Sequence, residues 1–174
     1  VEKKREAWFF LASVYFTRGE RVVDTIIGLG NAGCAIANEF TKYPQYRVYK
    51  LDVDIPEGVD TFSWKRPQKY EDYERNCPDL TEFFKEVKGE VLFIVGGGGR
   101  VSSASLGVLR YLKEYSLNIL YIKPDLTFLG KDAQLLHNMV YNVLQEYARS
   151  GVFKRIYLID NVMLEKIIPE ITIK

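Results

Sequence analysis

Residues 26–35 read Ile-Ile-Gly-Leu-Gly-Asn-Ala-Gly-Cys-Ala, so that the pattern G-x-G-x-x-G lies between an apolar segment and a helical one. Glycines in this pattern let the chain turn tightly and bring its backbone close to a phosphate, and the following helix offers free N–H groups. We therefore predict a phosphate-binding loop formed by Gly28, Gly30, Asn31, Ala32 and Gly33. The alternative is a tight strand-to-helix turn that holds no ligand.

A second glycine-rich stretch, Phe-Ile-Val-Gly-Gly-Gly-Gly-Arg-Val-Ser-Ser-Ala-Ser, occupies residues 93–105 and again stands between an apolar segment and a helical one. Four successive glycines cost backbone entropy that a simple turn does not require. Their N–H groups can form a concave anion site, to which neighbouring side chains can add donors. This loop adds Gly97, Gly98, Gly99, Arg100 and Ser102 to the predicted site, with a flexible hinge as the alternative.

Short apolar segments at residues 21–28, 46–52, 90–95, 117–122 and 154–160 alternate with helical patterns at residues 32–41, 80–87, 103–115 and 131–148. This alternation predicts βαβ units. The expected fold class is α/β: a three-layer, Rossmann-like, mostly parallel sheet with helices on both faces. The two glycine loops would then meet at the carboxyl ends of neighbouring strands and grip one polyphosphate. Residues 1–174 are expected to form a single nucleotide-binding domain, with residues 1–20 as an N-terminal extension.

Several segments give further expectations. Residues 6–16 are ambiguous and weakly favour an added edge strand, whereas residues 56–78 contain prolines, charges and aromatics and predict a long surface connection. The single histidine, His137, is expected on a helix surface, because no partner for catalysis stands at a suggestive spacing. An apolar stripe at helical spacing is expected to pack on the sheet; it comprises Leu135, Leu136, Met139, Val140, Val143, Leu144 and Tyr147.

Asp52 ends the second expected strand and stands 19 positions after Gly33, near the spacing at which an acidic residue contacts a ribose hydroxyl in dinucleotide-binding folds. We include Asp52 in the predicted site. The alternative is a carboxylate at a strand end that caps the next turn.

The order of these motifs resembles the FtsZ and tubulin family over about residues 22–168. Residues 28–38 align without a gap with the family's first glycine loop, and residues 97–103 fall on its signature G-G-G-T-G-T-G. Residues 122–131 resemble T-K-P-F-x-F-E-G-K. A strand then ends in Ile159-Asp160-Asn161, similar to the family's I-P-N, whose Asn contacts the guanine base. The resemblance thus adds Asn161 to the site.

The resemblance implies a tubulin/FtsZ-like GTPase domain that binds GTP or GDP, with Mg²⁺ as a possible companion, and that self-associates head to tail into filaments or a larger assembly. The sequence departs from the family at Arg100, Val101, Leu129 and Ala133, which alters the second loop and the ribose contacts. In the family, GTP hydrolysis also needs acidic residues from a second domain. The sequence given ends at Lys174, before the position where that domain would begin. The resemblance therefore implies, at most, a GTPase that depends on acidic residues absent from this chain.

The composition of the chain limits the classes of partner that it is expected to bind. With 24 basic and 23 acidic residues, the chain has no global field to attract nucleic acid or an anionic membrane. Two cysteines, Cys34 and Cys77, stand without metal-ligand spacing, and no apolar run is long enough to cross a bilayer. These features favour a cytoplasmic protein without a metal centre. An NAD-binding Rossmann protein and a structural or scaffold protein without nucleotide remain the alternative functions.

Overall fold

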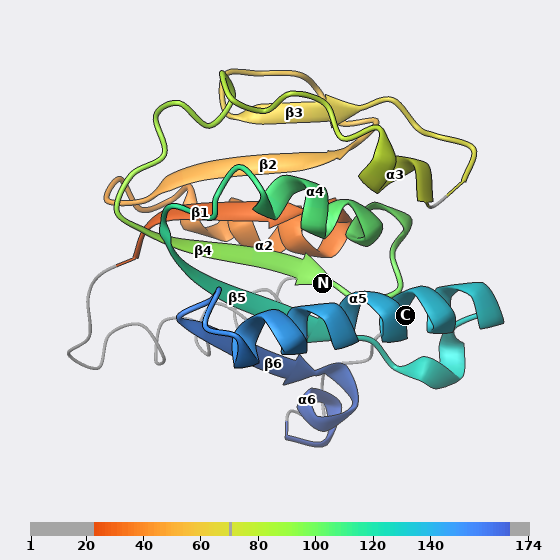
Figure 1. Ribbon diagram of the computed structural model, residues 1–174. Helices are drawn as coiled ribbons and strands as arrows, with labels where there is room; N and C mark the ends of the chain where they lie inside the picture. The colour runs from red at the N-terminus through yellow and green to blue at the C-terminus, as the bar shows by residue number, and fades with distance from the viewer. Residues whose placement is uncertain (1–22, 70, 168–174) are drawn as a thin grey trace.

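The computed structural model describes residues 23–69 and 71–167, which form a six-stranded parallel sheet in the order β3-β2-β1-β4-β5-β6 (Figure 1). The strand order reverses between β1 and β4, the two strands that precede the glycine loops. Every pairing is parallel, as the alternation of apolar and helical segments predicts. The strands are β1 (Val23–Leu29), β2 (Arg47–Val53), β3 (Thr61–Trp64), β4 (Glu90–Gly96), β5 (Ser116–Lys123) and β6 (Arg155–Asp160).

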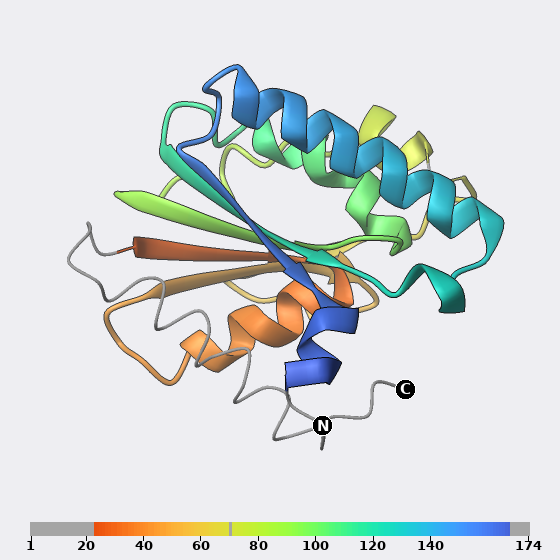
Figure 2. The ribbon, with the colours of Figure 1, turned by 90° about the horizontal axis from the view of Figure 1, so that it is seen from below.

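Helices cover both faces of the sheet, which confirms the three-layer α/β prediction (Figure 2). One face carries α2 (Gly30–Phe40) and α6 (Asn161–Ile167). The other carries α3 (Glu71–Arg75), the 3₁₀ turn η1 (Arg100–Ala104), α4 (Ser105–Leu109) and α5 (Lys131–Arg149). A second 3₁₀ turn, η2 (Leu126–Phe128), leads into α5. Among the described residues, no helix is both long and apolar enough to span a membrane.

Two apolar cores lie on the two faces of the sheet. Strands with helices on both sides bury successive side chains alternately in each core, so they are apolar throughout rather than alternating. In β4, Val91, Phe93 and Val95 join the core beneath α4 and α5, whereas Leu92 and Ile94 join the core beneath α2. All five side chains are inaccessible to solvent. The central strands are therefore fixed by packing, which places the loops at their carboxyl ends.

The prediction of a surface connection over residues 56–78 is wrong in its central part. This segment supplies β3, which pairs in parallel with β2 and extends the sheet by one strand. It also supplies two buried aromatic side chains, Trp64 and Tyr73, whose rings meet edge to face. Four residues between prolines give a weak strand signal on their own, and the pairing with β2 decides their conformation.

Two expected helices are shorter than predicted. Residues 80–87 form hydrogen-bonded turns, although Leu80, Phe84 and Val87 are buried as a helix would bury them. The expected helix at residues 103–115 is divided into η1, α4 and further turns, because most of its later hydrogen bonds join residues three apart. The edge strand expected at residues 6–16 lies outside the described residues.

The apolar stripe of α5 is only partly buried. Leu136, Val140 and Leu144 lie in the core as expected, but Leu135 is 62% exposed and Met139 58% exposed. The stripe is wider than the contact between one helix and the sheet, so its margin faces outward.

A buried polar cluster joins three strands at the amino ends of the sheet. Glu90 accepts hydrogen bonds from Asn118 Nδ2 at 2.7 Å and from Lys154 Nζ at 2.8 Å, and its own N–H donates to Asp24. Glu90 and Asn118 are both buried. Polar groups in such a place remain favourable only while each keeps its partner.

We expect Glu90→Ala to lower the free energy of unfolding by about 2 kcal/mol, because it leaves buried Asn118, and the Lys154 side chain at 37% exposure, without their acceptor. Urea unfolding measures this loss. Glu82→Ala is the matched control, since Glu82 pairs with Lys85 at the surface, and such pairs contribute less than about 1 kcal/mol. Equal losses in the two variants would contradict the role given to the cluster.

Candidate nucleotide site at the carboxyl ends of strands β1 and β4

The two glycine loops meet at one cavity of about 330 Å³. The ends of β1 and β4 lie side by side, since Leu29 pairs with Val95, and this is where the strand order reverses. Open α/β sheets bind their ligands at such a switch point. The cavity is lined by Leu29, Gly30, Asn31, Ala32, Asp52, Val53, Arg66, Tyr73, Gly96, Gly97, Gly99, Arg100, Val101 and Ser102.

The first loop presents the beginning of α2 to this cavity. Gly30 begins the helix with a φ of 70°, a left-handed conformation that favours glycine. Leu29, the N-cap residue, makes no side-chain capping bond, and the first turn contains no acidic residue. The N–H groups of Gly30, Asn31 and Ala32 therefore stand at the positive end of an 11-residue helix without a side-chain cap. This arrangement suits a phosphate.

Gly28 and Gly33 do not line the cavity, although they belong to the same motif. A Cβ atom on Gly28 would lie 2.5 Å from the carbonyl oxygen of Gly33. A Cβ atom on Gly33 would lie 2.4 Å from the carbonyl oxygen of Ile94 in β4. These two glycines therefore allow α2 to pack closely on β1 and β4, which positions the residues that do line the cavity.

The second loop leaves β4 and turns at once into η1. Gly97 N–H donates to the carbonyl of Ile122 at 2.8 Å, which fixes the start of the loop beside β5. Ser102 was expected to offer its hydroxyl to a ligand; instead the hydroxyl donates to the carbonyl of Gly99, and the side chain is buried. Gly99 is the N-cap of η1 and makes no side-chain capping bond. Arg100 is exposed at the rim of the cavity.

Gly98 faces the segment before α5 rather than the cavity. It has a φ of 78°, and a Cβ atom there would lie 2.8 Å from Leu129 Cδ1. Gln134 holds that segment in turn, donating to the carbonyls of Leu126 and Leu129 at 2.9 and 3.0 Å. The second loop is thus braced from behind by the residues that precede α5.

Asp52 lines the cavity near the end of β2, as its position at the end of the expected strand predicts. Its Oδ1 accepts the N–H of Val53 at 2.8 Å. Burial raises the pKa of Asp52, and the nearby carboxylate of Asp54 raises it further. Beneath it, burial and Asp52 raise the pKa of Cys34 to about 12, so this thiol stays protonated and donates to backbone carbonyls.

Sequence reasoning missed Arg66 and Tyr73, which also line the cavity. Arg66 pairs with Asp54, and the Tyr73 ring is buried. Burial raises the pKa of Tyr73, and the positive charges of Arg66 and Arg100 act in the opposite direction. The mixture of basic and aromatic residues at 64–70 was the available signal, but it reads equally well as a solvated loop.

Asn161, the expected base-contacting residue, is not part of the cavity lining. It begins α6, directly after β6, at the same carboxyl edge of the sheet. Its Oδ1 atom is buried and has no hydrogen-bond partner among the described residues. Asp160 beside it pairs with Lys123 at 2.8 Å and accepts the N–H of Val162, so the turn into α6 is held in place.

His137 is not on the helix surface, contrary to expectation. It is 2% exposed, and its Nδ1 is hydrogen-bonded to Tyr121 Oη at 2.8 Å beneath the second glycine loop. Burial lowers the pKa of His137, and the charge of Lys123 lowers it further. The imidazole of His137 is therefore buried and neutral, with its Nδ1 bound to Tyr121 of β5.

The lowered pKa of His137 predicts a pH dependence of stability. Below its ordinary pKa near 6.5, an unfolded chain takes up a proton that the folded chain resists. The stability linked to His137 is therefore complete above about pH 6.5 and is lost as the pH falls through its lower folded pKa. Urea unfolding of the wild type and His137→Asn between pH 5 and 8 checks this, since the variant should lose that part of the slope. Parallel curves would contradict it.

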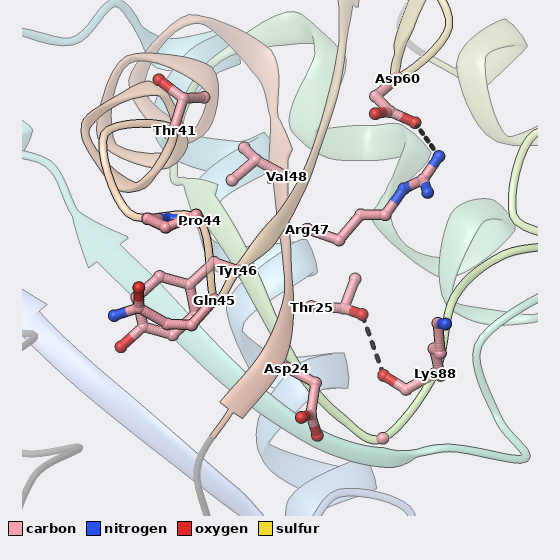
Figure 3. A pocket seen from close by; sticks show the side chains of 11 residues that line it. Asp24, Thr25, Thr41, Pro44, Gln45, Tyr46, Arg47, Val48, Asp60 and Lys88 are labelled. Carbon is pink, nitrogen blue, oxygen red and sulfur yellow. Dashed lines mark hydrogen bonds and ion pairs between the residues drawn. The ribbon is translucent and has the colours of Figure 1, made fainter.

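A larger cavity, of about 780 Å³, lies at the opposite end of the sheet, beside the amino ends of β1 and β2 (Figure 3). Its polar groups bind one another: Arg47 pairs with Asp60 at 2.9 Å, and the Thr25 hydroxyl donates to the Lys88 carbonyl at 3.0 Å. It contains none of the expected site residues. The glycine-lined cavity has the better chemistry for a phosphate despite its smaller size.

The residues of the smaller cavity fit the phosphates of a nucleotide. Two glycine-rich turns present backbone N–H groups, and Arg66 and Arg100 add positive charge. In the part of the chain that the structure describes, no three His, Cys, Asp or Glu side chains gather closely enough to hold a metal ion.

The parallel sheet, its strand order and the cavity at its switch point define an α/β protein of the Rossmann-like class. Within that class, the fold is similar to that of an FtsZ dimer from M. jannaschii, described as empty, with a TM-score of 0.69 and 13% sequence identity. The match covers 95% of this chain and 52% of the FtsZ chain, so this chain spans about half the length of that protein. No protein-family model and no curated protein matches the sequence. The FtsZ-like fold is thus established by structure.

Proposed function

We propose that this chain binds a guanine nucleotide, GTP or GDP, and serves as an FtsZ-like assembly module. The observation that carries the proposal is the meeting of two uncapped, glycine-rich turns at one cavity on the β1/β4 switch point. The positive end of α2 and the exposed Arg100 favour a polyanion there. The proposal concerns binding and assembly, and it assigns no catalytic residue.

Each part of the nucleotide has a proposed place. The phosphates lie against Gly30, Ala32 and Gly99, where backbone N–H groups and the helix dipole act together. Asp52, at the edge of the same cavity, receives the ribose hydroxyls. The base extends along the carboxyl edge of the sheet toward Asn161, whose buried Oδ1 lacks a partner among the described residues and can accept from guanine N–H groups.

Assembly is proposed from the dimer to which the fold is similar and from the position of the cavity. The cavity opens at one end of the sheet, so a second copy stacked head to tail would cover the nucleotide. Heterologous contacts of this kind produce filaments when the rotation between copies does not close. Residues 1–174 act as one nucleotide-binding unit in this proposal.

We expect Asn161→Ala to weaken GTP binding about tenfold, through loss of a hydrogen bond to the base, and to leave tripolyphosphate binding unchanged. Isothermal titration of both ligands into both proteins measures the difference. Asn138→Ala on the exposed side of α5 is the control and should bind like the wild type. Equal GTP affinity of wild type and Asn161→Ala would remove Asn161 from the site.

NAD is the second candidate ligand, and the strand order with Asp52 at the end of β2 favours it. In dinucleotide-binding folds, an acidic residue at this place binds the adenosine ribose. NAD leaves the second glycine turn with less to bind, because its pyrophosphate sits on the first loop alone. Competition between GTP and NAD for the cavity separates the two ligands.

A further inference from the structure

Gly97 rests directly on two buried side chains. A Cβ atom at this position would lie 2.4 Å from Tyr121 Oη and 2.6 Å from His137 Nδ1, closer than real Cβ atoms approach. The two side chains are joined to each other by a hydrogen bond of 2.8 Å. The Tyr121–His137 pair therefore packs directly against Gly97, at the start of the second glycine turn.

The pair has little freedom to move. The His137 ring stacks on Tyr141, with 8° between the planes and 5.8 Å between centroids, and Tyr121 lies 5.3 Å from the same ring. Tyr121 and His137 are almost completely buried. Gly97 is held from the other side, because its N–H donates to the carbonyl of Ile122. A shift of either ring would be transmitted to the turn that lines the cavity.

Burial first, and then the charge of Lys123, lower the pKa of His137 and keep its imidazole neutral. Tyr121 and Lys123 face it from β5, and Tyr141 faces it from its own helix. Lys123 is itself neutralised by Asp160 of β6 at 2.8 Å. A single hydrogen bond between two neutral side chains joins Tyr121 to His137. Removing either side chain leaves the other buried without a hydrogen-bond partner.

We infer that His137 is a positioning residue of the anion site: through Tyr121 it holds Gly97 in place, and so sets the direction of the N–H groups that follow in the turn. The inference rests on the proposed function for its consequence, which is phosphate affinity. Its geometric part, the support of Gly97, stands independently of any ligand. The expected ligand chemistry is the polyphosphate of a nucleotide.

The test compares wild type with His137→Leu and His137→Asn. Leucine fills the space without a hydrogen-bonding group, whereas the asparagine amide places one near the position of Nδ1 and can donate or accept. Amide hydrogen exchange of Gly97 is the first measurement, with Phe93 of β4 as an internal reference for global stability. Tripolyphosphate affinity by calorimetry is the second.

We expect the ratio of Gly97 exchange to Phe93 exchange to rise about tenfold in His137→Leu and to return to near the wild-type ratio in His137→Asn. Tripolyphosphate affinity should fall about tenfold in His137→Leu and recover in His137→Asn. If His137→Leu does not fold, Tyr121→Phe removes the same hydrogen bond and replaces it in the comparison.

Failure of the inference about His137 and failure of the proposed nucleotide binding give different results. Equal Gly97 exchange in wild type and His137→Leu, or an equal increase at Phe93, overturns the inference, because the pair then gives no local support. Absence of tripolyphosphate and GTP binding in wild type overturns the proposed function, whereas the exchange comparison still decides whether His137 holds the turn.

Discussion

Gly33→Ala is expected to lower the free energy of unfolding by about 3 kcal/mol, because the added methyl group has no room between α2 and β4. The new Cβ atom would lie 2.4 Å from the carbonyl oxygen of Ile94 and 3.2 Å from its carbonyl carbon. Backbone atoms of a central strand cannot rotate away as a side chain does. The substitution therefore forces α2 away from β4 and opens the core that Ile36 and Ala37 share with Ile94.

Gly99→Ala is the matched control for Gly33→Ala. No atom lies within 4 Å of a Cβ built on Gly99, and its φ of −77° suits any residue. Its stability should stay within about 0.5 kcal/mol of wild type. Urea unfolding of the two variants measures the contrast, and equal stability of Gly33→Ala and Gly99→Ala would show that α2 does not pack on β4 as closely as described.

Ala32→Asp is expected to weaken GTP binding at least about a hundredfold, the largest effect on binding, because a carboxylate would face the phosphates at close range. Ala32 lines the cavity in the first turn of α2, beside Gly96 of the second loop. Its side chain is exposed, so the substitution does not disturb the core. An acidic residue in the first turn also interacts favourably with the helix dipole, so the free energy of unfolding should not fall.

Ala32→Asn separates charge from size in that experiment. Asparagine has nearly the shape of aspartate without its charge, so its GTP affinity should fall far less than that of Ala32→Asp. Calorimetric titration of both variants, with thermal unfolding to confirm that both fold, completes the comparison. Equal affinities of Ala32→Asp and Ala32→Asn would contradict a phosphate at the start of α2.

The sequence predicted the sheet class and the two loops because their signals are local. A glycine pattern between an apolar strand and a helix specifies the turn without reference to distant residues. The order of the apolar segments then implied that the two loops meet, and they share one cavity. Gly28 and Gly33 instead allow α2 to pack closely on the sheet. This role depends on the distance between α2 and β4, which the motif does not reveal.

The features that sequence reasoning missed depend on tertiary contacts. β3 has only four residues and is specified by pairing with β2. Arg66 and Tyr73 reach the cavity because that pairing carries the following segment over the carboxyl edge. His137 looked like a surface residue because its partner, Tyr121, stands on another element and 16 positions away. Periodicity describes one helix, whereas burial depends on what lies opposite.

Titration of the chain with fluorescent GTP, competed separately by unlabelled GTP, ATP and NAD, shows whether the cavity binds a guanine nucleotide. The expected result is saturable binding that unlabelled GTP displaces and that ATP and NAD displace much less. Displacement by NAD alone would contradict the guanine-nucleotide proposal in favour of the dinucleotide alternative. Absence of binding would contradict any nucleotide function and leave an FtsZ-like fold that serves assembly without a ligand.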